Sequence, residues 1–157
     1  MTTSNLRDLM ARHHRDGRID WIGLRPARRA PMDPVDRAVI EDRGLRGDRH
    51  PKPGKRAVTL VQAEHLPVIS ALCGTAATPE RLRRNLVVSG INLAALKGRG
   101  IWVGAALLRL SGPCAPCSRM EEELGPGAYS AVRHHGGWCA EVIESGPVAI
   151  GDRVAPA

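Results

Sequence analysis

The sequence predicts a mainly β protein with short helices, an α+β fold built on a closed or nearly closed mixed β-barrel of about seven strands. Short apolar segments rich in branched residues recur along the chain, and the 17 glycines and 12 prolines tend to fall between them. The segments with helical patterns are few and short. Closure is expected because a small sheet must otherwise protect exposed edges.

A length of 157 residues suits one ordinary core. The chain shows no internal repeat, low-complexity linker or change of composition that would mark a boundary. We therefore expect a single domain over residues 1–157, with the proline-rich piece near residue 30 forming a crossing loop inside it.

In the first half of the chain, alternating and branched residues indicate strands, and glycine or proline clusters separate them. Gly44–His50 has the composition of a turn-rich loop with several polar side chains. The expected elements are a short amphipathic helix over Leu6–Arg15 and strands over Gly17–Leu24, Arg37–Glu41 and Lys55–Val61.

The second half begins with two short helices. Thr78 is a suitable N-cap and Pro79 suits the first helical position, so the second helix is expected to begin there. Alternation and apolar runs then indicate further strands, the longest of them interrupted by Gly104. The expected elements are helices over Glu64–Leu72 and Thr78–Arg84 and strands over Asn85–Ser89, Ile101–Leu110, Trp138–Glu144 and Val148–Val154.

The segment Leu110–Met120, LSGPCAPCSRM, is where we expect the chemistry, because Cys114 and Cys117 each follow a proline directly after a strand. Proline restrains the backbone, so a thiolate there is held in a shaped loop. Such positioning suits a metal ligand or a sulfur nucleophile. Of the other two cysteines, Cys73 and Cys139 are expected to be buried and incidental.

Cysteine content, net charge and aromatic content indicate where the protein is located and what kind of ligand it binds. Four cysteines without a signal-like apolar stretch near the N-terminus favour a reducing, cytoplasmic location, and no run approaches the roughly 20 apolar residues of a membrane span. The net charge of +7 favours an anionic partner. With three Trp, one Tyr and no Phe, the chain lacks the stacking surfaces of a nucleic-acid reader, so a small phosphorylated molecule is the better match.

Several motifs in succession resemble the MOSC family, the domain named after the C-terminal part of molybdenum cofactor sulfurases. The resemblance extends over about residues 17–154 and rests on their order: GLRGDRH at 44–50, RAVTLV at 56–61, RLRRNL at 81–86, then Gly104, Pro116-Cys117, Gly136-Gly137 and Gly151-Asp152. It implies a β-barrel-rich fold, a cysteine that ligates molybdenum or carries sulfur, and a basic pocket for the phosphate of the pterin cofactor.

Residue by residue, the resemblance matches Cys117 to the family's key cysteine and puts Arg81, Arg83 and Asn85 forward as contacts of the molybdenum cofactor (molybdopterin). Arg84 replaces a position often held by proline, which leaves open which guanidinium faces the site. These residue types suit the implied roles. Thiolate sulfur binds soft metals, and the planar guanidinium of arginine donates two parallel hydrogen bonds to phosphate oxygens.

Asp48 and His50 are expected either to transfer protons or to orient the residues that contact the ligand. Histidine suits proton transfer because it changes charge near neutral pH. An equally simple reading is that Asp48 caps a turn through its own backbone.

Two activities fit such a site. In the first, Cys117 stays on molybdenum and the protein reduces small N-hydroxylated compounds with electrons from a separate flavin or iron–sulfur protein. In the second, Cys117 carries a persulfide supplied by a pyridoxal-phosphate cysteine desulfurase. A third reading is a zinc or thiol-redox protein, because Cys114-x-x-Cys117, His134, His135 and Cys139 offer enough ligands for a tetrahedral site.

Overall fold

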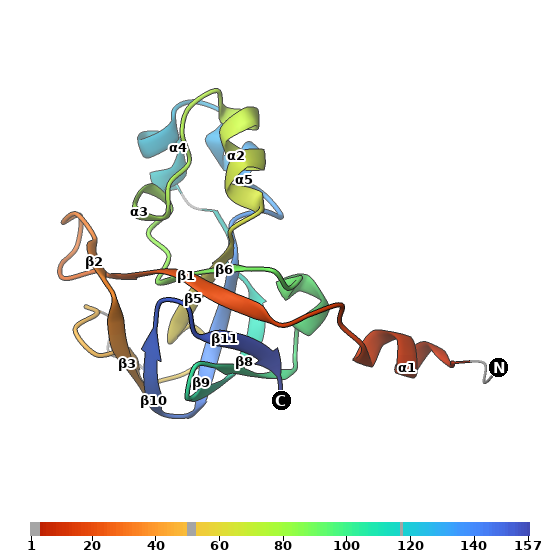
Figure 1. The fold of residues 1–157 in the computed structure, drawn as a ribbon. Coiled ribbons are helices and arrows are strands. Elements are labelled where there is room, and N and C mark those ends of the chain that lie inside the picture. Colours follow the sequence, from red (N-terminus) through yellow and green to blue (C-terminus); the bar gives the residue numbers. More distant parts are fainter. Residues whose placement is uncertain (1–3, 50–52, 117) are drawn as a thin grey trace.

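The computed structural model describes residues 4–49, 53–116 and 118–157. Seven strands pair in a closed ring, which confirms the predicted mixed β-barrel (Figure 1). The β5–β6 pair is parallel and the other pairs in the ring are antiparallel. In ring order the strands are β1 (Gly17–Leu24), β11 (Arg153–Pro156), β7 (Gly100–Val103), β8 (Ala106–Pro113), β9 (Trp138–Glu144), β5 (Val58–Gln62) and β6 (Leu86–Ser89).

A second, three-stranded sheet lies beside the barrel, at the end away from the helices (Figure 1). Its strands are β10 (Gly146–Ala149), β3 (Arg37–Glu41) and β4 (Gly44–Leu45). A short strand, β2 (Asp33–Val35), pairs with the end of β1 inside the stretch that was predicted to be a loop. Pro34 is tolerated there because an edge strand can lack one amide donor.

Four helices form a lobe over one end of the barrel, while α1 extends away from the body (Figure 1). Thr78 accepts a hydrogen bond from the Arg81 amide and Pro79 opens α3, as predicted. Two of the lobe helices, α4 and α5, were not anticipated. The helices are α1 (Leu6–Ala11), α2 (His65–Cys73), α3 (Pro79–Leu82), α4 (Ser118–Leu124) and α5 (Ala128–Val132), with a 3₁₀ turn at Leu93–Leu96. Within the described residues, none of the helices has the length and apolar content needed to cross a bilayer.

Strands β5 and β6 are buried on both faces, which joins the barrel to the helical lobe. Leu60 and Leu86 point into the barrel core, whereas Val61 and Val87 belong to a second apolar cluster under the helices. Because successive side chains of a strand face opposite ways, one strand serves both cores. This explains why β5 reads as a continuous apolar run in the sequence.

Some predicted boundaries differ from the structure. The expected strand over residues 101–110 is a hairpin, because Gly104 adopts a left-handed conformation (φ +57°) and turns the chain between β7 and β8. The last expected segment likewise divides into β10 and β11, which lie in different sheets. The first helix ends at Ala11, four residues before the predicted Arg15.

Gly137 is expected to tolerate no side chain. Its φ is +99°, and a Cβ there would overlap the carbonyl oxygen of Leu60. Gly137→Ala should lower the free energy of unfolding by about 3 kcal/mol or more, because overlap adds to backbone strain. Gly98 has a similar φ of +76° with no atom near the Cβ position, so Gly98→Ala should cost only about 1 kcal/mol. Urea denaturation measures both, and equal losses would contradict the role given to the overlap.

Candidate functional site

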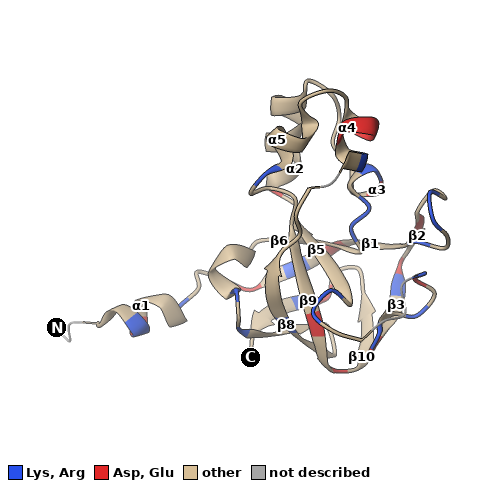
Figure 2. Ribbon diagram, turned by 180° about the vertical axis from the view of Figure 1, so that it is seen from behind, with Lys and Arg blue, Asp and Glu red and all other residues tan. Residues whose placement is uncertain are grey.

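Two pockets share Arg25 and Arg84, and the smaller of them is also lined by residues of α3 and α4. The larger, here called the thiol pocket, has a volume of about 750 Å³ and is lined by Arg25, Pro53, Lys55, Arg56, Thr59, Arg84, Pro113, Cys114, Ala115 and Cys139. The smaller, here called the arginine pocket, has a volume of about 160 Å³ and is lined by Leu82, Met120 and six arginines: Arg25, Arg49, Arg81, Arg83, Arg84 and Arg119. Figure 2 shows basic residues along α3 and the loops near β2 and β3.

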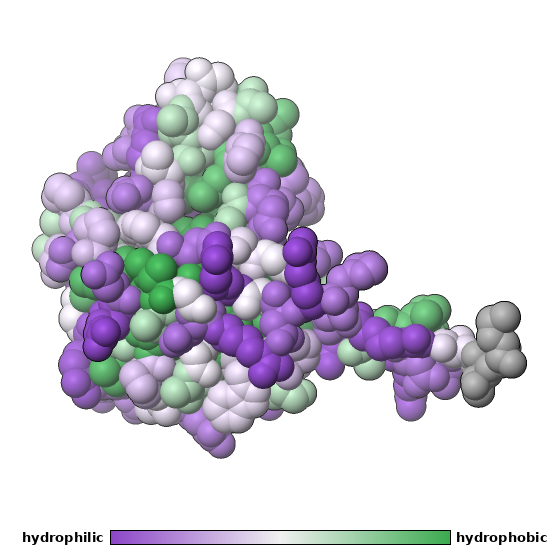
Figure 3. Space-filling view, viewed as in Figure 1, coloured by the Kyte–Doolittle hydropathy of each residue, from purple (hydrophilic) through white to green (hydrophobic). Residues whose placement is uncertain are grey.

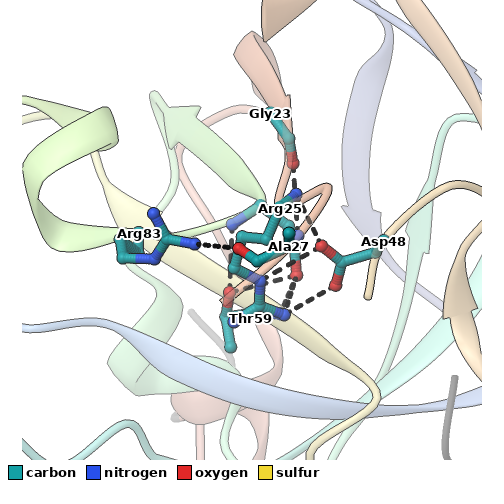
Figure 4. Close-up of polar contacts among 7 residues, drawn as sticks. Gly23, Arg25, Ala27, Asp48, Thr59 and Arg83 are labelled. Atoms are coloured by element: carbon teal, nitrogen blue, oxygen red, sulfur yellow. Dashed lines mark hydrogen bonds and ion pairs between the residues drawn. The ribbon is translucent and has the colours of Figure 1, made fainter. Parts of the chain in front are cut away.

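Asp48 holds Arg25 in place where the two pockets meet (Figure 4). Its carboxylate accepts hydrogen bonds from the Arg25 backbone amide (2.8 Å), Nε (3.1 Å) and Nη2 (2.7 Å). The Asp48 side chain is 2% exposed and that of Arg25 is 14% exposed. A bidentate pair this buried fixes the orientation of the guanidinium. The geometry therefore makes Asp48 a positioning residue for Arg25, and the predicted proton-handling role stays a prediction.

Asn85, directly before β6, is fully buried, and its side chain joins β1 to β5. Its Oδ1 accepts hydrogen bonds from the Thr59 amide and hydroxyl (3.1 Å each) and from Arg25 Nη2 (3.3 Å). Its Nδ2 donates to the Gly23 carbonyl oxygen at 3.2 Å. The amide is thus used inside the protein, and the predicted contact with a cofactor is not tested by this arrangement.

Arg83 lies at the end of α3 in a left-handed conformation (φ +57°), with its guanidinium near the other arginines. It donates hydrogen bonds to the carbonyl oxygens of Ala30 (2.5 Å) and Ala27 (3.3 Å), the latter drawn in Figure 4. Burial lowers the pKa of Arg83, and the nearby charges of Arg119, Arg25 and Arg49 lower it further. Clustered guanidinium groups repel one another, so a bound anion would stabilise their charged forms.

Arg81 contacts the helical lobe more than the pocket. Its guanidinium donates to the Ala76 carbonyl oxygen (2.8 Å), the Thr75 hydroxyl (3.3 Å) and the Glu123 carbonyl oxygen. The Glu123 carboxylate lies 4.0 Å from Arg81 Nε. Arg81 therefore links α3 to α4 while it forms one wall of the arginine pocket.

Arg84 lines both pockets, whereas Arg81 and Arg83 line only the arginine pocket. It is 7% exposed, and its Nε donates to the Gly136 carbonyl oxygen at 2.6 Å. Its Nη2 is buried and has no hydrogen-bond partner among the described residues. A buried donor without a partner is costly, so this nitrogen is available to a ligand.

Cys114 and Cys139 meet in the thiol pocket, a contact that the sequence did not indicate. Cys114 donates its amide to the Gly137 carbonyl oxygen (2.8 Å), which continues the β8–β9 pairing and brings its side chain to that of Cys139. The hydrogen bond between the two thiols lowers the pKa of Cys114 to about 6; burial opposes this shift, and Arg84, Arg25 and Arg56 support it. The same hydrogen bond and burial raise the pKa of Cys139.

Two predicted site residues, Cys117 and His50, lie outside the described residues, so their roles stay predictions. The chain on both sides of Cys117 contributes to the site: Cys114 lines the thiol pocket, and Arg119 lines the arginine pocket. Of the proposed zinc ligands, His135 packs edge-on against His65, with ring centroids 5.3 Å apart. The described part of the chain contains no group of three or more side chains suited to a metal ion.

A family model for the MOSC domain matches residues 37–155, about three quarters of the chain. The chain belongs to the MOSC domain family. This family is associated with molybdenum cofactor binding. A search of curated proteins found no match.

Solved structures resemble this MOSC domain over most of its length. YuaD from Bacillus subtilis has a TM-score of 0.79 at 20% identity, with 89% of this chain and 94% of that chain covered. YiiM from Geobacillus stearothermophilus has a TM-score of 0.73 at 18% identity, with coverage of 90% and 75%. YiiM from Escherichia coli has a TM-score of 0.69 at 20% identity, with coverage of 89% and 69%. At these identities the likeness establishes the fold.

Removing the Asp48 charge should destabilise this MOSC domain. Asp48→Asn leaves Arg25 without its carboxylate and should lower the free energy of unfolding by about 3 kcal/mol. Glu141 pairs with Arg109 at 3.5 Å on the exposed surface, so Glu141→Gln should cost less than about 1 kcal/mol. Chemical denaturation of both variants tests the difference, and similar small losses would contradict the anchoring role of Asp48.

Cys114 should be alkylated as a thiolate at neutral pH. Because its pKa is lowered to about 6, the rate of iodoacetamide modification should be near its plateau at pH 7 and fall as the pH drops through about 6. Cys139→Ala removes the hydrogen-bond donor and should move this midpoint to higher pH. Peptide mass spectrometry after timed labelling follows each cysteine separately. A midpoint that does not move in Cys139→Ala would contradict the assigned cause.

Proposed function

We propose that this MOSC domain binds the molybdenum cofactor, with Cys117 as the molybdenum ligand, and reduces small N-hydroxylated compounds. The observation that supports it most is the arginine pocket, which six arginines line. Among the described residues, the carboxylates paired with these arginines are Asp48, with Arg25, and Glu123, with Arg81. The remaining positive charge needs an anion.

The residues present fit the phosphate of such a cofactor. Arg83, Arg119 and Arg49 present like charges to one small space, and Arg84 adds a buried nitrogen without a described partner. An arginine fork donates two parallel bonds to phosphate oxygens, and burial strengthens them. We assign the phosphate to Arg83 and Arg84, with Cys117 as the thiolate that holds the metal.

When bound, the cofactor supplies the two-electron chemistry that removes oxygen from an N–OH group. The protein contributes positioning and charge. Asp48 and Asn85 hold the Arg25 guanidinium at the boundary of the two pockets, so the positive field there is preorganised. The thiol pocket, with a volume of about 750 Å³, has room for a small-molecule substrate beside the arginine pocket.

Electrons are proposed to come from a separate flavin or iron–sulfur protein. The described residues contain no cluster of cysteines that could ligate an iron–sulfur centre.

A second candidate is a persulfide carrier on Cys117, loaded by a pyridoxal-phosphate cysteine desulfurase. One observation favours it: the hydrogen bond with Cys139, supported by nearby arginines, lowers the pKa of Cys114 to about 6, and the same arginine charges would stabilise a persulfide anion.

Metal analysis tests the first proposal. Protein purified anaerobically from a host that makes molybdenum cofactor should contain close to one molybdenum per chain by plasma mass spectrometry, and Cys117→Ser should lose it. Arg83→Ala should retain less cofactor, by about 1–3 kcal/mol of binding free energy, because one charge-assisted phosphate bond is lost. Arg109, an exposed arginine paired with Glu141, provides the control Arg109→Ala, which should retain the wild-type amount.

Three results would overturn this proposal. Molybdenum retained in Cys117→Ser would remove that residue from the metal site. Zinc at one per chain, lost with either Cys114 or Cys117, would favour the zinc reading instead. Absence of metal together with a persulfide on Cys117, detected by mass spectrometry, would favour the sulfur carrier.

A further inference from the structure

The thiol pocket contains a pair of cysteines that the proposed function does not use. Cys114 lies one residue beyond β8, and Cys139 lies on the adjacent strand β9. Both cysteines line the thiol pocket, where the β8–β9 register sets Cys139 opposite Gly112, and Cys114 is the more exposed of the two. Two neighbouring thiols at the wall of a cavity are suited to thiol–disulfide exchange.

The same pocket is positively charged, and its chemistry points to an anionic ligand. Arg25, Lys55, Arg56 and Arg84 line it; Asp48 pairs with Arg25, and the described lining residues themselves include no carboxylate. Arg84 is more than nine-tenths buried, and its Nη2 has no hydrogen-bond partner among the described residues. This donor is an observation independent of the cysteines, and in protein without the cofactor phosphate it calls for another acceptor, such as a carboxylate.

We propose that the thiol pocket is a thiol–disulfide exchange site for small anionic disulfides, in which Cys114 is the attacking thiol and Cys139 the resolving thiol. Carboxylates of the disulfide pair with Arg56 and Arg84, which brings one of its sulfurs to Cys114. The pocket volume of about 750 Å³ accommodates a molecule the size of a tripeptide disulfide in part, with the rest in solvent.

The exchange has two steps, and each is balanced. The Cys114 thiolate attacks one sulfur of the small disulfide, whose S–S bond breaks; the first small thiol leaves with the electron pair, and a mixed disulfide remains on Cys114. Cys139 then gives up its proton and attacks the Cys114 sulfur, and the second small thiol leaves and takes a proton. In total the two protein thiols are oxidised to a disulfide and the small disulfide is reduced to two thiols. The lowered pKa of Cys114 favours the first step at neutral pH.

The test uses the full chain with Cys73→Ser and Cys117→Ser, so that Cys114 and Cys139 are the only thiols. The probes are glutathione disulfide, which is anionic, and cystamine, which is a cationic disulfide. Each rate is divided by the rate of free cysteine with the same probe, which removes intrinsic reactivity. We expect the normalised rate to be about tenfold higher for glutathione disulfide than for cystamine. High salt should reduce this preference.

Variants assign the two roles. In the Cys73→Ser, Cys117→Ser protein, called the parent, the reaction should proceed to a Cys114–Cys139 disulfide. With Cys139→Ser added, it should stop at the mixed disulfide, and peptide mass spectrometry should find one glutathione on Cys114. Cys114→Ser should abolish the fast reaction. Arg56→Gln, at an exposed position in the pocket wall, should slow the reaction of glutathione disulfide more than that of cystamine, because it removes a partner of the carboxylate as well as a charge that lowers the pKa of Cys114. Arg109→Gln, on an exposed strand position outside the pocket, should change neither rate.

Equal normalised rates for the two probes would overturn the anionic specificity, and glutathione found first on Cys139 would overturn the assignment of the thiols. A parent protein that accumulates the mixed disulfide as Cys139→Ser does would exclude a resolving role. Cys117 is absent from every protein in this test, so these results are independent of whether Cys117 binds molybdenum.

Discussion

The hydrogen bonds around Asn85 are the constraint on which the site depends. This fully buried amide joins the Gly23 carbonyl oxygen of β1 to Thr59 of β5, and it also accepts from Arg25. The parallel β5–β6 pair and the β1–β6 pair therefore meet at one polar group inside an apolar barrel. Because a buried amide must satisfy all of its donors and acceptors, the position of Arg25 is tied to the closure of the barrel itself.

The helical lobe positions some of the arginines that line the arginine pocket. Val61 and Val87 face the lobe while their neighbours fill the barrel, so the helices are held by the outer face of the strands that carry Thr59 and Asn85. This arrangement places α3 against β1 and α4 against α3, with Arg83 and Arg119 on the same small pocket. By contrast, α1 makes no such packing: Leu6, Leu9 and Met10 are exposed, and Figure 3 shows apolar side chains on that protruding segment.

Local patterns predicted the barrel well and the site in part. Strands over Gly17–Leu24, Arg37–Glu41 and Trp138–Glu144 were located correctly because alternation and flanking turn residues are local signals. The hairpin at Gly104 was read as one strand, since a single glycine in an apolar run does not reveal a left-handed turn. Arg81 and Arg83, put forward by the family resemblance, line the arginine pocket, and their contact with a cofactor stays a prediction. The Cys114–Cys139 contact was missed because it depends on the long-range register of β8 with β9, for which one sequence carries little signal.

Arg25 and Arg84 belong to both pockets, and this has a consequence for occupancy. An anion in one pocket neutralises guanidinium charge that an anion in the other pocket would also use. Two negative ligands therefore compete electrostatically without touching, and each weakens the other by the same factor, since coupling free energies are reciprocal. A neutral ligand in the larger pocket would escape this competition. The shared arginines thus make the charge of one ligand a determinant of how firmly the other is held.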